Sequence, residues 1–206
     1  MTTATVAAFR NDTALRQLGA DTRYVLTGFP IGILTFAGAV AGLALGAGTA
    51  VLVVGVPILA GTLAAASRVA AAERRRAARV LGRPVPAPYP ARRGSRLASA
   101  EAWRALAYAL VRFVPNTVAS GLVVTWWAAA IGGLSTALWD WAIPYEPRYE
   151  GLPALIGLGS ATETRIWFFT ACGLFFALTL MPLVRSMARM EASFAEFALS
   201  SRMGAS

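Results

Sequence analysis

Long apolar runs dominate the pattern of residues along this chain. From Tyr24 to Ala66 no residue carries a charge, and this run is about twice the roughly 20 residues that one helix needs to cross a bilayer. It predicts a hairpin of two helices, with a tight glycine-rich turn at Gly46–Thr49. Two further apolar runs follow later in the chain. The pattern predicts an all-α integral membrane protein with four transmembrane helices, at about 25–46, 49–67, 113–134 and 166–184.

Segments beside these runs have one apolar face. Apolar residues recur every three or four positions over 15–29, 103–113 and 183–197. Such stripes are typical of amphipathic helices that lie at a membrane interface. We expect two amphipathic interfacial lead-in helices that turn inward near Pro30 and Pro115. The third stripe predicts a cytoplasmic C-terminal helix over 185–200.

Charge distinguishes the connections between the predicted spans. Residues 68–104 hold ten arginines and two glutamates, whereas 135–165 hold four carboxylates and two arginines. Short loops rich in arginine stay on the cytoplasmic side. We therefore expect a cytoplasmic basic linker at 68–104, an extracellular loop at 135–165 and cytoplasmic N and C termini. The chain then forms a single four-span membrane domain over 1–206.

The two halves of the chain share a pattern. The stretch YVLTGFP at 24–30 resembles YALVRFVP at 108–115, with tyrosine, leucine and phenylalanine in register. Glu73 and Glu191 are each followed by alanine four residues later and leucine eight residues later. Because both halves start and end inside, they predict two parallel helical-hairpin repeats about an axis normal to the membrane. A chance match in a sequence rich in alanine and leucine is the alternative.

Composition agrees with a membrane protein and removes most catalytic chemistry. Of the 206 residues, 57% are hydrophobic and 14% are charged, against roughly 25% charged in soluble domains. The chain has no histidine and its 19 cationic residues are all arginine, which removes imidazole bases and Schiff-base lysines. Ion-coupled carriers usually place Asp or Glu within their spans. The predicted spans of this chain contain neither residue. We expect no enzymatic activity, no cofactor and no metal.

The net charge of +9 predicts an anionic lipid surface as a partner, and no nucleic acid, because most arginines flank apolar runs. The candidate lipid contacts are Arg74, Arg75, Arg76 and Arg112. Arg112 interrupts YALVRFVPN at the start of the third span, and at the bilayer centre it would cost at least a few kcal/mol. The repeat aligns it with Gly28 near the interface, so we expect its side chain to extend to headgroups. A binding residue within the membrane is the alternative.

Three other features of the sequence predict a binding loop, close helix packing and the end of a helix. The loop LWDWAIPYEPRYEG is typical of an interfacial aromatic belt, but it is also the outer stretch best able to bind a stimulus; its candidate residues are Trp139, Asp140, Trp141, Tyr145 and Glu146. Small-residue spacing predicts close helix packing within the chain, or else a homodimer face, at Gly38, Gly42 and Gly46. After the second span, we expect Glu73 to pair with Arg76 and Gly82 to end the helix.

Four stretches together resemble a known family. They are LRQLGADTRYVLTGFP at 15–30, LGRPVPAPY at 81–89, LWDWAIP at 138–144 and LVRSMARMEASFAEFALS at 183–200. They are similar to the "putative sensor" domain of actinobacterial membrane proteins, a four-span module found ahead of histidine kinases or on its own. The resemblance covers about 15–199 and implies an input module of the bacterial plasma membrane, associated with two-component signal transduction.

The resemblance also predicts a function. The family implies that the signal leaves through the helix after the fourth span, and this chain carries no phosphoacceptor histidine of its own. We expect a stand-alone membrane sensor or regulatory protein that passes an envelope stimulus to a signalling partner. The alternatives are an accessory or permease-like subunit of an export system and a membrane scaffold.

Overall fold

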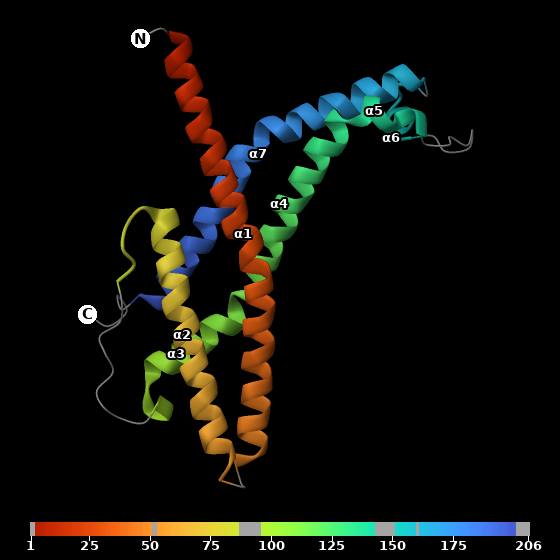
Figure 1. The fold of residues 1–206 in the computed structure, drawn as a ribbon. Helices are drawn as coiled ribbons and strands as arrows, with labels where there is room; N and C mark the ends of the chain where they lie inside the picture. Colours follow the sequence, from red (N-terminus) through yellow and green to blue (C-terminus); the bar gives the residue numbers. More distant parts are fainter. Residues whose placement is uncertain (1–2, 51–52, 87–95, 143–150, 160, 201–206) are drawn as a thin grey trace. The chain divides into compact units, whose positions relative to one another are not determined.

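The computed structural model describes residues 3–50, 53–86, 96–142, 151–159 and 161–200 (Figure 1). Within these ranges every regular element is helical. The long helices are α1 (Thr3–Gly48), α2 (Gly55–Leu81), α4 (Phe113–Leu134) and α7 (Thr162–Leu199). The shorter helices are α3 (Ala100–Val111), α5 (Thr136–Trp139) and α6 (Leu152–Leu155), with 3₁₀ turns at Arg96–Ala98 and Asp140–Ala142.

Four helical stretches are long and apolar enough to cross a membrane. They are Thr13–Gly48, Gly55–Leu81, Ala100–Leu134, which joins α3 and α4, and Thr162–Leu199. The prediction of an all-α membrane protein with four transmembrane helices is confirmed. Each stretch exceeds the roughly 20 residues of one crossing, so each has residues to spare for the interface or for a tilted path.

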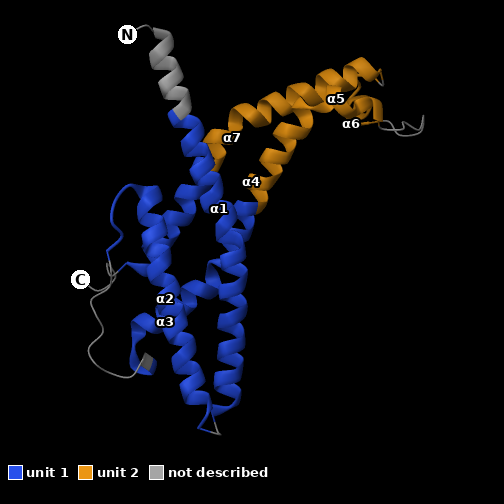
Figure 2. Ribbon diagram, in the orientation of Figure 1, with its two compact units in different colours: residues 1–120, 185–206 blue, residues 121–184 orange. Residues whose placement is uncertain are grey.

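The chain divides into two compact units, coloured separately in Figure 2. Unit 1 comprises 1–120 and 185–206, and unit 2 comprises 121–184. Unit 1 thus contains α1, α2, α3, the start of α4 and the C-terminal end of α7. Unit 2 contains the remainder of α4 and α7 with the short helices between them.

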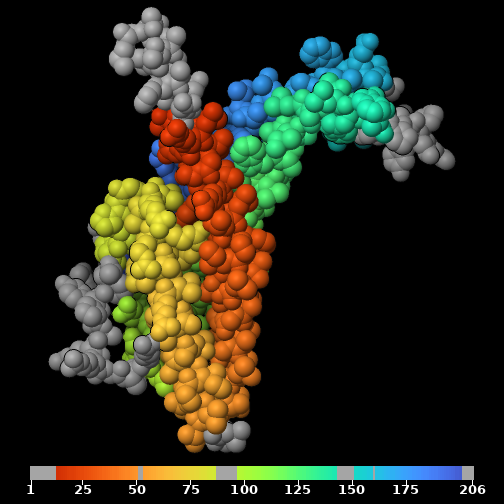
Figure 3. All heavy atoms as spheres, viewed as in Figure 1, coloured from red at the N-terminus to blue at the C-terminus, as the bar shows by residue number. Residues whose placement is uncertain are grey.

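In unit 1, α1 and α2 lie side by side (Figure 3), and α3 packs against both. Small side chains dominate the core between α2, α3 and the end of α7. The following residues of this core are no more than 6% exposed: Leu63, Ala66, Ala70, Ala77, Ala105, Leu106, Ala109, Ala192, Ala195 and Leu199. Alanine at such positions lets helix backbones approach closely in a membrane, where dispersion contacts replace the hydrophobic effect as the driving force.

The turn of the first hairpin lies later than predicted. α1 continues to Gly48 and α2 begins at Gly55. Close packing is present at two of the three predicted glycines: a Cβ atom on Gly46 would lie 3.1 Å from the Leu59 Cβ, and one on Gly42 would overlap Thr62. Gly38 differs, because no atom beyond its chain neighbours and the adjacent backbone of its own helix lies within 4 Å of its Cβ position.

The lead-in segments join their spans in two different ways. In the first half, lead-in and span form the single helix α1, which continues through Pro30. In the second half the lead-in is a separate helix, α3, whose N-terminus is capped by the Ser99 hydroxyl accepting from the Ala102 N–H at 3.3 Å. Downstream, the fourth span and the predicted C-terminal helix are also one helix, α7, which continues through Pro182. Gly82 ends α2 with a φ of 67°, as predicted.

Unit 2 depends on a close approach of α4 and α7. A Cβ atom on Gly133 would lie 2.6 Å from the Gly173 Cα, so the two backbones touch at these glycines. Further along, the Trp126 Nε1 donates to the Thr179 hydroxyl at 3.0 Å, and its ring meets Phe176 edge-on with centroids 5.0 Å apart. These contacts hold the two helices of the second hairpin together.

Candidate functional site

Seven polar and aromatic side chains meet within unit 1. We call them the polar cluster: Tyr24, Glu73, Arg76, Tyr108, Arg112, Asn116 and Glu191. They come from α1, α2, α3, α4 and α7, with Arg112 at the C-cap of α3. Glu73, Arg112 and Asn116 are only 2%, 5% and 2% exposed. Groups as buried as these are costly unless they are paired or hydrogen-bonded.

Glu73 has two cationic partners on one oxygen. Arg76, one turn later on α2, donates from Nη1 to the Glu73 Oε1 at 2.8 Å, which confirms the predicted pair. The Nη1 of Arg112 lies 2.9 Å from the same oxygen. The Arg112 contact has the distance of an ion pair without the alignment of a hydrogen bond. Arg76 is therefore the better aligned of the two partners.

Both guanidinium groups also lie over tyrosine rings. The Cζ of Arg76 is 5.1 Å from the ring centroid of Tyr24, and the Cζ of Arg112 is 5.5 Å from that of Tyr108. These distances are within the range of about 6 Å over which a cation is attracted to an aromatic face. Arg76 additionally donates from Nη2 to the Tyr24 carbonyl at 3.1 Å and to the Thr27 hydroxyl at 2.9 Å. It therefore ties α2 to α1.

The second carboxylate of the cluster has a different environment. Within the described residues, the buried Oε1 of Glu191 and both amide atoms of Asn116 have no hydrogen-bond partner. They line a cavity of about 10 Å³ together with Glu73 and Arg112, which is space for about one water molecule. Buried polar atoms without partners are uncommon in folded proteins. Their presence here marks the Glu191 side of the cluster as incompletely satisfied.

Two glycines of α1 make room for Asn116. A Cβ atom on Gly28 would lie 2.8 Å from the Asn116 Oδ1 and 3.6 Å from the Glu191 Oε2, and one on Gly32 would overlap the Asn116 Nδ2. Nearby, the Ser120 hydroxyl donates to the Val25 carbonyl at 3.3 Å. The N-terminal part of α4 can therefore approach α1 closely because these positions lack side chains.

The predicted repeat converges on this cluster. Tyr24 and Glu73 of the first half line the same cavity as Tyr108 and Glu191, the residues matched to them in the second half. The alanines that follow the two glutamates, Ala77 and Ala195, are 0% and 1% exposed. The matched tyrosines and glutamates of the two halves thus meet in one cluster. This agreement is not expected of a chance match between short motifs.

The two halves differ in the positions of their arginines. Arg112 occupies the position that is Gly28 in the first half. Conversely, Arg76 of the first half corresponds to Phe194, which stacks on Tyr108 with ring centroids 5.9 Å apart. Each half therefore supplies one glutamate, one tyrosine and one arginine, but the arginines come from different positions. With these residues ionised, the cluster carries two negative and two positive charges.

The predicted headgroup contact of Arg112 is corrected by the structure. Its side chain is 6% exposed and directed at Glu73, because an internal carboxylate supplies the counter-charge that a lipid phosphate was expected to supply. Arg76 is engaged by Glu73 in the same way. Arg74 is half-buried, and of the four candidate lipid contacts Arg75 is the one with an exposed side chain.

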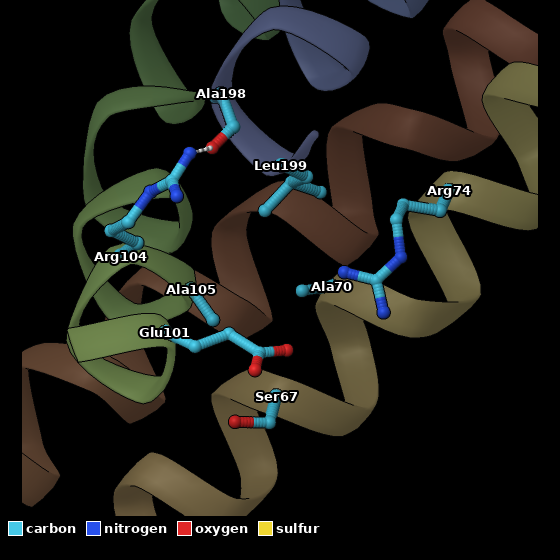
Figure 4. Close-up of a pocket in the computed structure, with 8 residues that line it drawn as sticks. All are labelled: Ser67, Ala70, Arg74, Glu101, Arg104, Ala105, Ala198 and Leu199. Carbon is cyan, nitrogen blue, oxygen red and sulfur yellow. Dashed lines mark hydrogen bonds between the residues drawn. The ribbon is translucent and has the colours of Figure 1, made fainter. Parts of the chain in front are cut away.

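Arg74 lines a second small cavity, of about 20 Å³ (Figure 4). Glu101 and Arg104 of α3 also line it, close to the C-terminal end of α7. Arg104 donates from Nη2 to the carbonyls of Ala198 at 3.4 Å and Ser200 at 3.0 Å. A cation at the last carbonyls of a helix satisfies acceptors that have no partner within the helix. Arg104 thus fastens the end of α7 to α3.

The candidate sensing loop is only partly described. Trp139 and Trp141 are 42% and 84% exposed, whereas Tyr145 and Glu146 lie outside the described residues. Asp140 is 5% exposed, and it accepts two hydrogen bonds from Arg165, from Nε at 2.9 Å and from Nη2 at 2.6 Å. The Asp140 carboxylate is therefore engaged within unit 2 rather than directed at the exterior.

Sequence reasoning identified parts of the polar cluster without locating it. Glu73 and Glu191 served as markers of the repeat and were placed outside the spans, and Asn116 was not singled out. The available signal was the repeat itself, since matched tyrosines and matched glutamates in a chain with ten acidic residues are informative. No group of three or more His, Cys, Asp or Glu residues that could hold a metal ion occurs among the residues with described positions.

Comparison with known proteins adds one finding. A family model described as "Putative sensor" matches residues 24–199, a range that contains every member of the polar cluster. Searches of curated proteins and of solved structures found no match. The match covers far more than half of the chain. The chain therefore belongs to the family described as "Putative sensor".

Proposed function

We propose that this protein is a sensor of the bacterial plasma membrane that passes an envelope stimulus to a signalling partner and catalyses no reaction itself. Family membership supports a sensor role. The observation that carries the proposal is the polar cluster, in which α1, α2 and α3 meet the C-terminal end of α7 through charged and partly unsatisfied groups. A stimulus that shifts the span helices would alter these contacts.

The C-terminal end of α7 is the output element in this proposal. Three features fasten it within unit 1: its alanines are buried, Arg104 binds its last carbonyls, and Arg83 donates to both carboxylate oxygens of Glu196 at 2.6 and 2.7 Å. Its other face is apolar and exposed among the described residues, since Met190 and Phe197 are 41% and 67% exposed. An amphipathic helix with one such face suits a partner helix or groove.

Crosslinking and co-purification from native membranes test the proposal. We expect the full chain to recover a signalling or regulatory protein and Phe197→Ser to reduce that recovery several-fold, because the exposed ring supplies apolar contact area. Leu178→Ser is the matched control, since Leu178 lies on the same helix, is 71% exposed and belongs to unit 2. Recovery of no such partner, or equal loss with both variants, would count against the proposal.

One observation favours a second function, that of an export subunit. A groove of about 450 Å³ lies between α1, α2 and α3, and its lining includes Gly38, Gly61 and Leu106. The hydroxyls of Thr35 and Thr62 in this lining donate to carbonyls of their own helices, so the groove suits apolar cargo. Substrate flux into vesicles that contain this protein alone would favour export over sensing.

A further inference from the structure

We propose that Arg112 exchanges between two carboxylates: Glu73 on α2, its partner in the structure, and Glu191 on the C-terminal end of α7. The inference deepens the proposed sensor function, on which its signalling consequence rests. It concerns the same cluster and identifies the contact that changes. Three features of the structure support it.

The first feature is the surplus of cations at Glu73. Its Oε1 has Arg76 at 2.8 Å and Arg112 at 2.9 Å, and only Arg76 makes an aligned hydrogen bond. Removing the sole partner of a buried charge is strongly destabilising. Arg112 can leave without that cost, because Arg76 remains on the same oxygen.

The second feature is the deficit at Glu191. Its buried Oε1 has no hydrogen-bond partner among the described residues, and the neighbouring Asn116 amide has none either. Glu191, Asn116 and Arg112 line the same small cavity. A guanidinium that turned toward Glu191 would therefore give a partner to a carboxylate oxygen that now has none.

The third feature is the lack of a side chain at Gly28. Both the Asn116 Oδ1 and the Glu191 Oε2 lie close to where a Gly28 side chain would start, at 2.8 and 3.6 Å. Gly28 is the position that matches Arg112 in the repeat. The first half thus leaves the Glu191 side without the arginine that the second half provides for Glu73.

The change of partner alters which helices the Arg112 ion pair joins. With Arg112 on Glu73, the ion pair connects the end of α3 to α2. With Arg112 on Glu191, it connects the end of α3 to α7. Two arrangements of similar energy are what a switching element requires, since a stimulus can then shift the population between them.

Hydrogen exchange of the backbone amides in 185–199 tests the proposal in the purified full chain in lipid nanodiscs. Glu73→Gln weakens the present partner, so Arg112 moves to Glu191 and exchange in 185–199 slows by about fivefold or more. Glu191→Gln removes the alternative partner, so exchange in this segment stays equal or becomes faster. Glu73→Gln combined with Arg112→Gln abolishes the slowing. Glu163→Gln is the control, since it makes the same chemical change on the same helix at an exposed position of unit 2.

Arg76→Gln provides a second variant that leaves both carboxylates intact. It leaves Glu73 with Arg112 alone, so Arg112 is held on α2 and exchange in 185–199 does not slow. Slowing with Glu73→Gln and none with Arg76→Gln or Glu191→Gln supports the exchange. If Glu73→Gln does not fold, equal or faster hydrogen exchange with Arg76→Gln supports the change of partner, and slower hydrogen exchange overturns it. Equal or faster exchange with folded Glu73→Gln also overturns it.

Partner recovery separates this inference from the sensor function. Suppose that the two glutamate variants shift amide hydrogen exchange in opposite directions and leave partner recovery unchanged. This result would support the change of partner of Arg112 and contradict the sensor proposal. Suppose instead that partner recovery changes and amide hydrogen exchange shifts in the same direction for both glutamate variants. This result would contradict the change of partner of Arg112 and leave the sensor proposal intact.

Discussion

In the described part of the chain, buried charges occur in two kinds of arrangement. In unit 1, Glu73 shares two guanidinium groups within a larger cluster. In unit 2, Asp140 and Arg165 form a separate bidentate pair, with side chains 6% and 11% exposed. Two parallel hydrogen bonds fix both the orientation and the distance of such a pair. The first arrangement permits exchange of partners, whereas the second favours a fixed contact.

The Asp140–Arg165 pair gives a prediction about stability. We expect Arg165→Met to lower the free energy of unfolding by about 3 kcal/mol, because it removes the bidentate partner of a buried carboxylate. Arg83→Met, which breaks the pair of Glu196 with a 55% exposed arginine, should cost about 1 kcal/mol or less. Unfolding in mixed micelles, followed by tryptophan fluorescence, measures both. Equal losses would show that burial does not set the strength of these pairs.

Replacing Gly28 or Gly19 of α1 by alanine should change the stability of the protein in opposite directions. In Gly28→Ala the new methyl group would lie 2.8 Å from the Asn116 Oδ1, so we expect destabilisation by about 1–3 kcal/mol. Gly19→Ala on the same helix meets no atom within 4 Å, so it should stabilise the helix by up to about 1 kcal/mol. Thermal unfolding of the two variants checks the signs, and stabilisation by both would contradict the described contact.

The sequence allowed individual residues of the site to be matched but not assembled. In the alignment of the two halves, Tyr24 corresponds to Tyr108 and Glu73 corresponds to Glu191. Such a repeat in the sequence does not show which helices are in contact. Asn116 could not be recognised, because its burial depends on two glycines of α1 across the contact. Residues whose role is set by a distant helix are the ones that sequence reasoning missed.

At the scale of elements, apolar runs predicted the helices well and their ends less well. The runs report which residues can lie in hydrocarbon, but α1 begins far ahead of its run and α7 continues well beyond its own. Pro30 and Pro182 lie inside these helices rather than at their boundaries. Transmembrane helices tolerate proline because neighbouring groups satisfy the freed carbonyls.

Two adjacent glycines test the contact between α4 and α7. A Cβ atom on Gly133 would meet the backbone of Gly173 at 2.6 Å, whereas one on Gly132 would meet nothing within 4 Å. We expect Gly133→Ala to destabilise the protein by about 1–3 kcal/mol or more, since backbone cannot move aside as a side chain can. Gly132→Ala should have no such cost. Unfolding measured in the same detergent compares the two, and similar stabilities would exclude a tight glycine contact.

At the scale of the whole molecule, composition and hydropathy were sufficient to predict a four-helix membrane protein, and the sequence motifs were sufficient to predict the family. The parallel repeat stays a prediction. The division into two units was not predicted, because α4 and α7 each pass from one unit to the other without any break in their hydrophobic pattern. Continuous helices hide a boundary that only contacts between elements define.

The arginine count predicts the orientation of the chain in the membrane, and this orientation can be measured directly. In a Cys172→Ala background, Leu158→Cys places a thiol in the predicted outer loop, where Leu158 is 54% exposed, and Pro86→Cys places one in the basic linker. A membrane-impermeant maleimide should label only Leu158→Cys on intact cells. Both variants should react after permeabilisation. Labelling of Pro86→Cys on intact cells would reverse the predicted topology.

The difference between positions 28 and 112 also bears on why both hairpins belong to one polypeptide. A dimer of identical hairpins would carry the same residue at both positions, so arginine would stand on both sides of the cluster or on neither. Joining the hairpins lets the two copies diverge, and Arg112 then faces two carboxylates in unequal surroundings. Covalent fusion therefore gives this protein something that symmetric self-association cannot provide: a single mobile cation with two distinguishable destinations.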